Sequence, residues 1–191
     1  MRLNLPPGYA PFAAGGFGTP SGKCELYSPG LAAQGKDPLP AYTPPYEDPQ
    51  TRPDLAARFP LQMVSPPEPS FLNSTFVNVE ALRRQAGEPT VQIHPHDAAA
   101  RGVADGQAVR VFNGRGSFQA RAVVGETVKA GVVVAQGIWW TKYTPDGANC
   151  NATTSTQLTD FGAGATFFDN LVEVEAIIPK RGSEGTGGRP R

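Results

Sequence analysis

The sequence lacks a run of about 18 apolar residues, an excess of either charge, and more than a trace of cysteine. Without such a run we expect no membrane-spanning helix, and no early hydrophobic segment fits a signal peptide. Lys+Arg and Asp+Glu balance at 17 each in 191 residues, which disfavours nucleic acid as a partner. The two cysteines, Cys24 and Cys150, form no Cys-x-x-Cys pair. We expect free thiols, with one disulfide as the alternative, in a soluble cytoplasmic protein.

Proline and glycine are abundant instead, with 20 and 22 residues. Both exceed ordinary usage of ~5% and ~7%, which favours a β-rich body with many loops. Prolines interrupt residues 1–58, which we interpret as an irregular lead-in made of the end of a preceding domain plus a linker. Within it, Cys24–Tyr27 alternates like a short strand. Residues 179–191 are rich in Gly and charge, and we expect a disordered tail there.

Residues 59–178 carry the signals of one β domain. A short helix is predicted over Val79–Gln85, and a helical turn over 98–101 with Asp97 as its N-cap. Asn113-Gly114 is a hairpin signal. Short apolar or alternating runs predict six strands, at 59–64, 90–93, 107–112, 117–124, 132–135 and 170–177. Strands this short, separated by Gly turns, predict a closed β-barrel.

The sequence offers little catalytic chemistry. His94 and His96 are the two histidines, and their spacing suits a metal, but Pro95 separates them and no third ligand is near. The alternative is a capping turn with exposed imidazoles. No Gly-x-Ser-x-Gly elbow is present, and the Gly-rich stretch 162–165 lacks the Lys of a phosphate loop. We therefore assign no catalytic and no metal-binding residue.

Two polar runs stand out, Ser65–Asn78 and Gly147–Thr154, both rich in amide and hydroxyl side chains. Such side chains are common in surface turns because they bond the local backbone, and they are equally suited to a large polar ligand. The pair Trp139-Trp140 leads towards the second run and is either core or the wall of a cleft.

Several motifs follow one another in a fixed order, among them Phe71-Leu72-Asn73-Ser74-Thr75-Phe76, Ile93-His94-Pro95, Gly102-Val103-Ala104-Asp105-Gly106 and Gly147-Ala148-Asn149. Together they resemble the C-terminal dinucleotide-binding domain of molybdopterin oxidoreductases of the dimethyl-sulfoxide-reductase family. The segment Gly18–Lys23 is similar to the stretch that precedes this domain. The resemblance covers nearly the whole chain except the tail.

The resemblance implies a six-stranded double-psi β-barrel and a molybdopterin guanine dinucleotide cofactor in its bis form, carrying molybdenum or tungsten. The domain would hold the pterin and nucleotide arms, because amides and hydroxyls can donate to and accept from these groups. Catalysis would lie in upstream domains of the same polypeptide, with an electron-transfer subunit as a candidate partner, so the chain alone is expected to be inactive. The residues implied in cofactor contacts are Ser65, Pro66, Ser70, Leu72, Asn73, Ser74, Asn149 and Asn151.

Two other functions are compatible with a barrel. Related barrels in chaperone ATPases and transcription factors recognise substrates or proteins and hold no cofactor, although they do not need the amide-rich loops. A small hydrolase would need a nucleophile paired with a base, and we find no such pair in the sequence.

Overall fold

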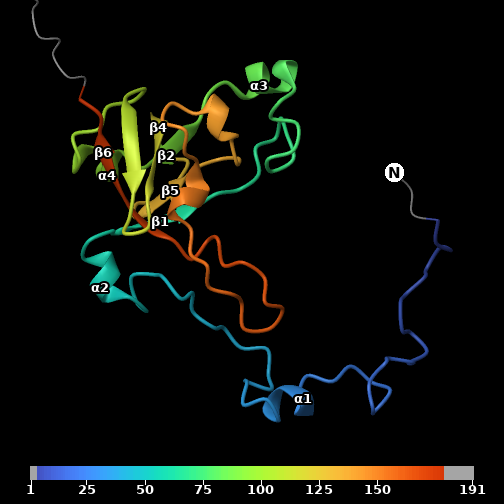
Figure 1. The fold of residues 1–191 in the computed structure, drawn as a ribbon. Helices are drawn as coiled ribbons and strands as arrows, with labels where there is room; N and C mark the ends of the chain where they lie inside the picture. The colour runs from blue at the N-terminus through green and yellow to red at the C-terminus, as the bar shows by residue number, and fades with distance from the viewer. Residues whose placement is uncertain (1–3, 179–191) are drawn as a thin grey trace, which may run out of the picture. The chain divides into compact units, whose positions relative to one another are not determined.

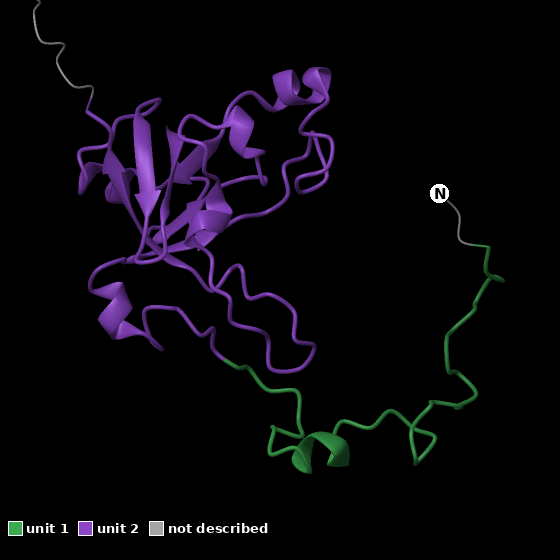
Figure 2. Ribbon diagram, viewed as in Figure 1, with its two compact units in different colours: residues 1–43 green, residues 44–191 purple. Residues whose placement is uncertain are grey.

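The computed structural model describes residues 4–178, so the tail predicted at 179–191 lies outside the described residues. The contacts divide the chain into two units, residues 1–43 and 44–191 (Figure 2). The first unit has one short helix, α1 (Pro29–Ala32), whose N-cap Ser28 accepts a hydrogen bond from the Leu31 N–H. The strand predicted at Cys24–Tyr27 was wrong, because the described part of this unit offers it no partner backbone and the segment bends instead.

The second unit is built around a closed β-barrel, as predicted (Figure 1). Its strands are β1 (Leu61–Val64), β2 (Thr90–Ile93), β3 (Ala108–Phe112), β4 (Ser117–Val124), β5 (Val132–Val134) and β6 (Leu171–Ala176). Each one lies within a predicted run or matches it. The order around the barrel is β1-β5-β2-β4-β3-β6.

The barrel mixes parallel and antiparallel pairs. β1 pairs in parallel with β5 and β2 with β4, while the other four pairs are antiparallel. β3 and β4 form the predicted hairpin, and the Asn113 N–H closes its turn by donating to the Gly116 carbonyl at 3.0 Å. Closure gives every strand two neighbours, so no edge is left to pair with another chain.

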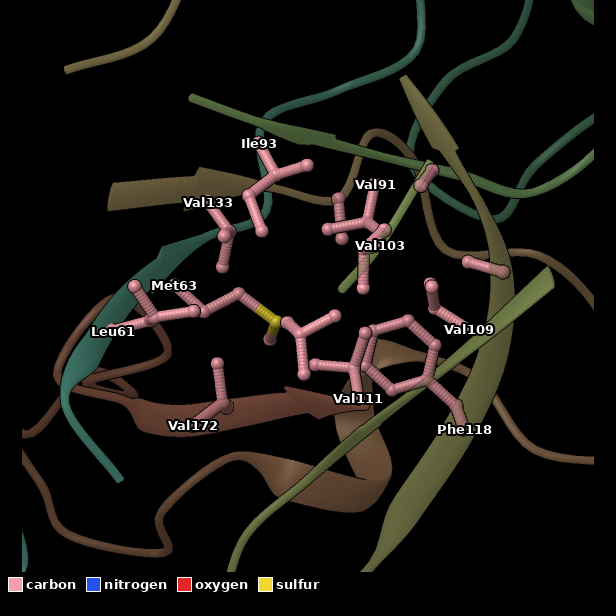
Figure 3. Close-up of a cluster of buried hydrophobic side chains, with 14 of the residues drawn as sticks. Leu61, Met63, Val91, Ile93, Val103, Val109, Val111, Phe118, Val133 and Val172 are labelled. Atoms are coloured by element: carbon pink, nitrogen blue, oxygen red, sulfur yellow. The ribbon is translucent and has the colours of Figure 1, made fainter. Parts of the chain in front are cut away.

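The barrel interior is filled by the inward side chains of alternating strand positions (Figure 3). Along β4, for example, Phe118, Ala120 and Ala122 are buried while Arg121 and Val123 point outward. The period of two is the one seen in the sequence, since successive side chains of a strand face opposite sides. The core further contains Leu61, Met63, Val91, Ile93, Val109, Val111, Val133, Val172 and Val174.

Short helices precede the barrel and connect its strands. α2 (Pro53–Ala56) precedes β1, α3 (Glu80–Ala86) lies one residue beyond its predicted position, and α4 (Pro95–Ala99) follows β2. Two 3₁₀ turns, η1 (Thr141–Tyr143) and η2 (Cys150–Thr153), follow β5. Within residues 4–178 no helix has the length and apolar character needed to cross a bilayer.

The prediction that Asp97 caps a helix was wrong. α4 starts earlier, with Pro95 at its first turn and His94 as the N-cap, whose Nδ1 accepts from the His96 N–H at 3.2 Å. Proline is favoured in a first helical turn because it has no N–H to leave unsatisfied. Asp97 is buried instead, and its carboxylate accepts from the Gly131 N–H at 2.6 Å.

Candidate functional site

The first polar loop leaves the end of β1 and folds into a tight turn at residues 72–75. The Thr75 N–H donates to the Leu72 carbonyl at 2.6 Å, and the Leu72 N–H donates to the Thr75 carbonyl at 3.1 Å. Asn73 has φ of +47°, a left-handed conformation in which Asn is found more often than most residues. The turn exposes the side chains of Asn73 and Ser74, and within residues 4–178 no hydrogen bond engages either of them.

The second polar loop is organised by Asn149, the N-cap of η2. Its side-chain oxygen accepts from the Asn151 N–H at 3.1 Å, and its amide nitrogen donates to the Trp139 carbonyl at 2.7 Å. Both ends of this half-buried amide are thus used within the protein. The neighbouring Asn151 is exposed, with its own amide directed to solvent. Asn149 holds the loop in place, whereas Asn151 presents a polar group on its surface.

The segment Gly137–Trp140 joins the two loops. Its first two residues bond the first loop, since the Gly137 N–H donates to the Pro66 carbonyl at 2.9 Å and the Ile138 N–H to the Asn73 carbonyl at 3.4 Å. The next residue bonds the second loop through Asn149. Asn73 and Asn149 therefore bond to consecutive residues of one segment, and the two loops converge.

A small core beneath the loops fixes this arrangement. Phe71, Val77 and Trp139 are buried against one another, and the Phe71 and Trp139 rings meet edge to face with centroids 5.3 Å apart. Trp139 is thus a core residue. Trp140 is partly exposed, and its indole N–H donates to the Ser74 carbonyl at 2.6 Å. The turn at 72–75 is held from below by packing and from the side by this bond.

The eight residues implied in cofactor contacts fall on these converging loops, in two roles. Ser65 and Ser70 are half-buried: Ser65 lies beside the Cys150 thiol, and the Ser70 N–H donates to the Glu68 carboxylate at 3.1 Å. Pro66 acts through its carbonyl. The exposed members are Leu72, Asn73, Ser74 and Asn151. They present two amides, one hydroxyl and one apolar surface, and they carry no charge.

A buried polar network under η2 was not predicted from the sequence. Thr153 and Asn170 are fully buried, and the Asn170 amide donates to the Thr153 hydroxyl at 3.1 Å. The Thr153 carbonyl accepts from Asn113 at 2.8 Å and from Arg115 at 2.7 Å. Arg115 also pairs with Glu47, whose carboxylate is 9% exposed, at 2.6 and 2.9 Å. The end of η2 is thereby tied to the turn between β3 and β4, to the residue before β6 and, through Arg115, to the segment before α2.

Cys150 is a structural residue of the same turn. Its thiol donates to the Gly137 carbonyl, with 3.6 Å between sulfur and oxygen. Burial raises the pKa of the Cys150 thiol to about 11, so it is neutral at physiological pH and unsuited to act as a nucleophile. Both cysteines are free in this structure, Cys24 exposed and Cys150 buried.

The chain matches known proteins over most of its length. Residues 61–171 match the family described as "Molydopterin dinucleotide binding domain". The chain is 40% identical over 167 residues to a probable oxidoreductase, YoaE, of Bacillus subtilis, covering 87% of this chain and 23% of that protein. It is 36% identical over 176 residues to the dimethyl sulfoxide reductase DmsA of Escherichia coli, covering 83% of this chain and 21% of that protein.

Solved structures agree on the fold. The acetylene hydratase of Pelobacter acetylenicus superposes with a TM-score of 0.68 at 23% identity, covering 82% of this chain and 24% of that one. At this identity the likeness shows the fold alone. The chain spans less than a quarter of the length of each of these relatives.

Proposed function

The chain belongs to the molydopterin dinucleotide binding domain family of dimethyl-sulfoxide-reductase-type oxidoreductases, and from this premise we propose that its two converging loops hold a molybdopterin guanine dinucleotide cofactor. The observation that carries the proposal is the bonding of Asn73 and Asn149 to consecutive residues of the segment Gly137–Trp140. It brings the amide-rich loops to one side of the barrel.

The groups on these loops fit such a cofactor. Pterin and guanine edges carry donors and acceptors side by side, and the exposed amides of Asn73 and Asn151 can match both. The carboxylate of the first loop, Glu68, accepts a hydrogen bond from the Ser70 N–H of its own turn. We assign direct contacts to Asn73, Ser74, Asn151 and the apolar side chain of Leu72. Ser65, Pro66, Ser70 and Asn149 hold the loops in shape.

In this proposal the chain acts as one domain of a longer oxidoreductase. When bound, the molybdenum or tungsten of the cofactor supplies the redox chemistry, and this chain contributes binding and orientation. Upstream catalytic domains of the same polypeptide and an electron-transfer subunit are the partners we expect, consistent with longer relatives of whose length this chain covers less than a quarter. A cytoplasmic location stays a prediction, and the cofactor-binding role does not depend on it.

The test removes the two exposed amides in the enzyme that carries this domain. We expect Asn73→Gly with Asn151→Ala to lower the bound molybdenum and the GMP released by acid hydrolysis. Glycine at residue 73 keeps the left-handed backbone, so the turn itself is spared. Loss of two or more hydrogen bonds at about 1 kcal/mol each weakens binding about 30-fold.

The matched control is Gln50→Ala, which removes an exposed amide ahead of α2. Its cofactor content should equal that of the unsubstituted enzyme. Thermal unfolding is measured for all three proteins, to separate lost contacts from lost folding. A double variant that melts normally and retains full molybdenum and GMP would contradict the assignment of Asn73 and Asn151.

A further inference from the structure

Beside the Asn73–Ser74 turn lies a pair of aromatic rings, of which Trp140 is exposed and Tyr143 is half-buried. Trp140 and Tyr143 are stacked with an interplanar angle of 22° and centroids 6.4 Å apart. Trp140 is bonded to the Ser74 carbonyl, so the pair is fixed to the same turn that presents the proposed cofactor contacts. We call Trp140, Tyr143 and the two cations that cover them, Arg83 and Lys142, the aromatic shelf.

Both cations are held over the rings. The Arg83 Cζ lies 3.9 Å from the centre of the Tyr143 ring, and the Lys142 Nζ lies 4.9 Å from the same centre and 5.0 Å from that of Trp140. The Arg83 Nη1 also donates to the Val77 carbonyl at 2.9 Å, which fixes the guanidinium relative to the first loop. Two flexible side chains are thus held in place beside the proposed site, which reduces the entropy lost on binding a ligand.

In the described part of the chain neither cation has a carboxylate partner. Six arginines of the described chain do: Arg52, Arg84, Arg101, Arg110, Arg115 and Arg121. Within residues 4–178 no carboxylate lies within ion-pair distance of Arg83 or Lys142, although both approach the same ring. Two positive charges held at one ring, without carboxylates to neutralise them, create a positive potential that favours an anion beside them.

We propose that the aromatic shelf binds the phosphate groups of the dinucleotide, with Arg83 and Lys142 as their ligands. The proposal rests on the function proposed above. It extends the site from the neutral amides, which contact the pterin and guanine rings, to the diphosphate that joins those two groups. A diphosphate carries at least two negative charges, which suits two cations. Its oxygens accept charge-assisted hydrogen bonds from guanidinium and ammonium groups. Because Ser74 bonds Trp140, an anion on the shelf lies next to a group held by the 72–75 turn.

The test uses the whole chain and four probes: inorganic pyrophosphate, GDP, guanosine and polyglutamate. The chain has two tryptophans, and Trp139 is buried, so a ligand that binds at the shelf should change chiefly the emission of Trp140. We expect pyrophosphate and GDP to change the fluorescence and to bind more weakly as salt is added. GDP should bind about 10-fold or more tightly than guanosine, as expected for hydrogen bonds to charged groups.

The variant Arg83→Gln with Lys142→Gln should abolish pyrophosphate binding and reduce GDP affinity to that of guanosine, leaving guanosine unchanged. Lys129→Gln is the matched control. It removes one exposed charge from the loop that precedes β5. The segment Gly137–Trp140 follows β5, so Lys129 lies at the opposite end of that strand. If the double variant melts early, Lys142→Gln alone, at an exposed position, should still lower the affinity for pyrophosphate.

The outcomes separate this proposal from the one on which it rests. Pyrophosphate binding that is absent in the unsubstituted chain, or unaffected by the substitutions, overturns the shelf as a phosphate site. Tighter binding of polyglutamate than of pyrophosphate overturns it as well, in favour of an acidic polypeptide. If pyrophosphate binds the shelf while GDP binds no better than pyrophosphate, the phosphate site stands and the recognition of guanine fails.

Discussion

Gly137 is the residue whose substitution most directly tests the convergence of the two loops. Its φ is +74°, and a Cβ built on it would lie 2.8 Å from the Glu68 Cβ and 3.0 Å from the Phe71 ring. Neither atom is the far end of a flexible chain: Phe71 is packed against Trp139, and the Glu68 Cβ is attached directly to its backbone. Gly137→Ala must therefore push residues 68–71 away from the segment Gly137–Trp140.

Two costs add in this variant. A left-handed alanine costs about 1–2 kcal/mol, and an extra methyl group forced into a packed site costs about 1–3 kcal/mol. The expected loss of unfolding free energy is therefore about 2–5 kcal/mol. Gly131→Ala is the matched control, because Gly131 has φ of +84° with no atom within 4 Å of the added Cβ, and its N–H to Asp97 is retained. It should lose only the backbone cost, about 1–2 kcal/mol.

Urea unfolding measures the difference in unfolding free energy between the two variants, and this difference is the steric cost alone. Cofactor content in the full enzyme gives the second result, since a displaced first loop separates Asn73 from Ile138 while the barrel stays closed. We expect Gly137→Ala to lose cofactor and Gly131→Ala to retain it. Equal losses of stability in the two variants would refute the close packing of Glu68 and Phe71 on Gly137.

Two further predictions concern buried groups. Burial raises the pKa of Cys150 from 9.0 to about 11, so its neutral thiol supports folding fully below about pH 9, and this support is lost as pH rises through 11. Urea unfolding measures this effect. Between pH 8 and pH 11 the free energy of unfolding should fall by about 2 kcal/mol more in the unsubstituted chain than in Cys150→Ala. An equal fall in the two proteins would contradict the prediction. Arg115→Met should lower the free energy of unfolding by about 3 kcal/mol, because it leaves the buried Glu47 carboxylate without its partner. Adding Glu47→Gln should restore part of that free energy in the same assay. No recovery would show that Glu47 is not the group left unpaired.

The barrel strands could be predicted because the information that sets them is local. Ser117–Val124 was predicted to the residue, since its buried and outward positions alternate without interruption and Asn113-Gly114 marks the turn before it. Cys24–Tyr27 shows the limit of the same signal. Alternation there is not enough, because a strand also needs partner backbone, which a pattern within four residues cannot report.

The support beneath the site could not be predicted, because its partners are distant in sequence. Arg115 meets Glu47 across 68 residues and Asn170 across 55. A buried ion pair leaves no periodic signal, and Glu47 stands in a Pro-rich segment that resembles a linker. The motif Arg115-Gly116 is nevertheless informative once the fold is known: a Cβ on Gly116 would lie 2.7 Å from the Ala152 carbonyl oxygen, so glycine allows η2 to pack on β4.

Asn149 shows what the structure adds to a motif match. The resemblance assigns Asn149 and Asn151 the same role, because both stand in one amide-rich run. The geometry separates them, since the Asn149 amide spans from Trp139 to Asn151 and the Asn151 amide faces solvent. A loop that must present polar groups to a large ligand needs some amides to fix its own backbone, because an unsupported loop would lose entropy on binding. The polar runs are therefore rich in asparagine for two reasons, and the structure identifies which residues serve each one.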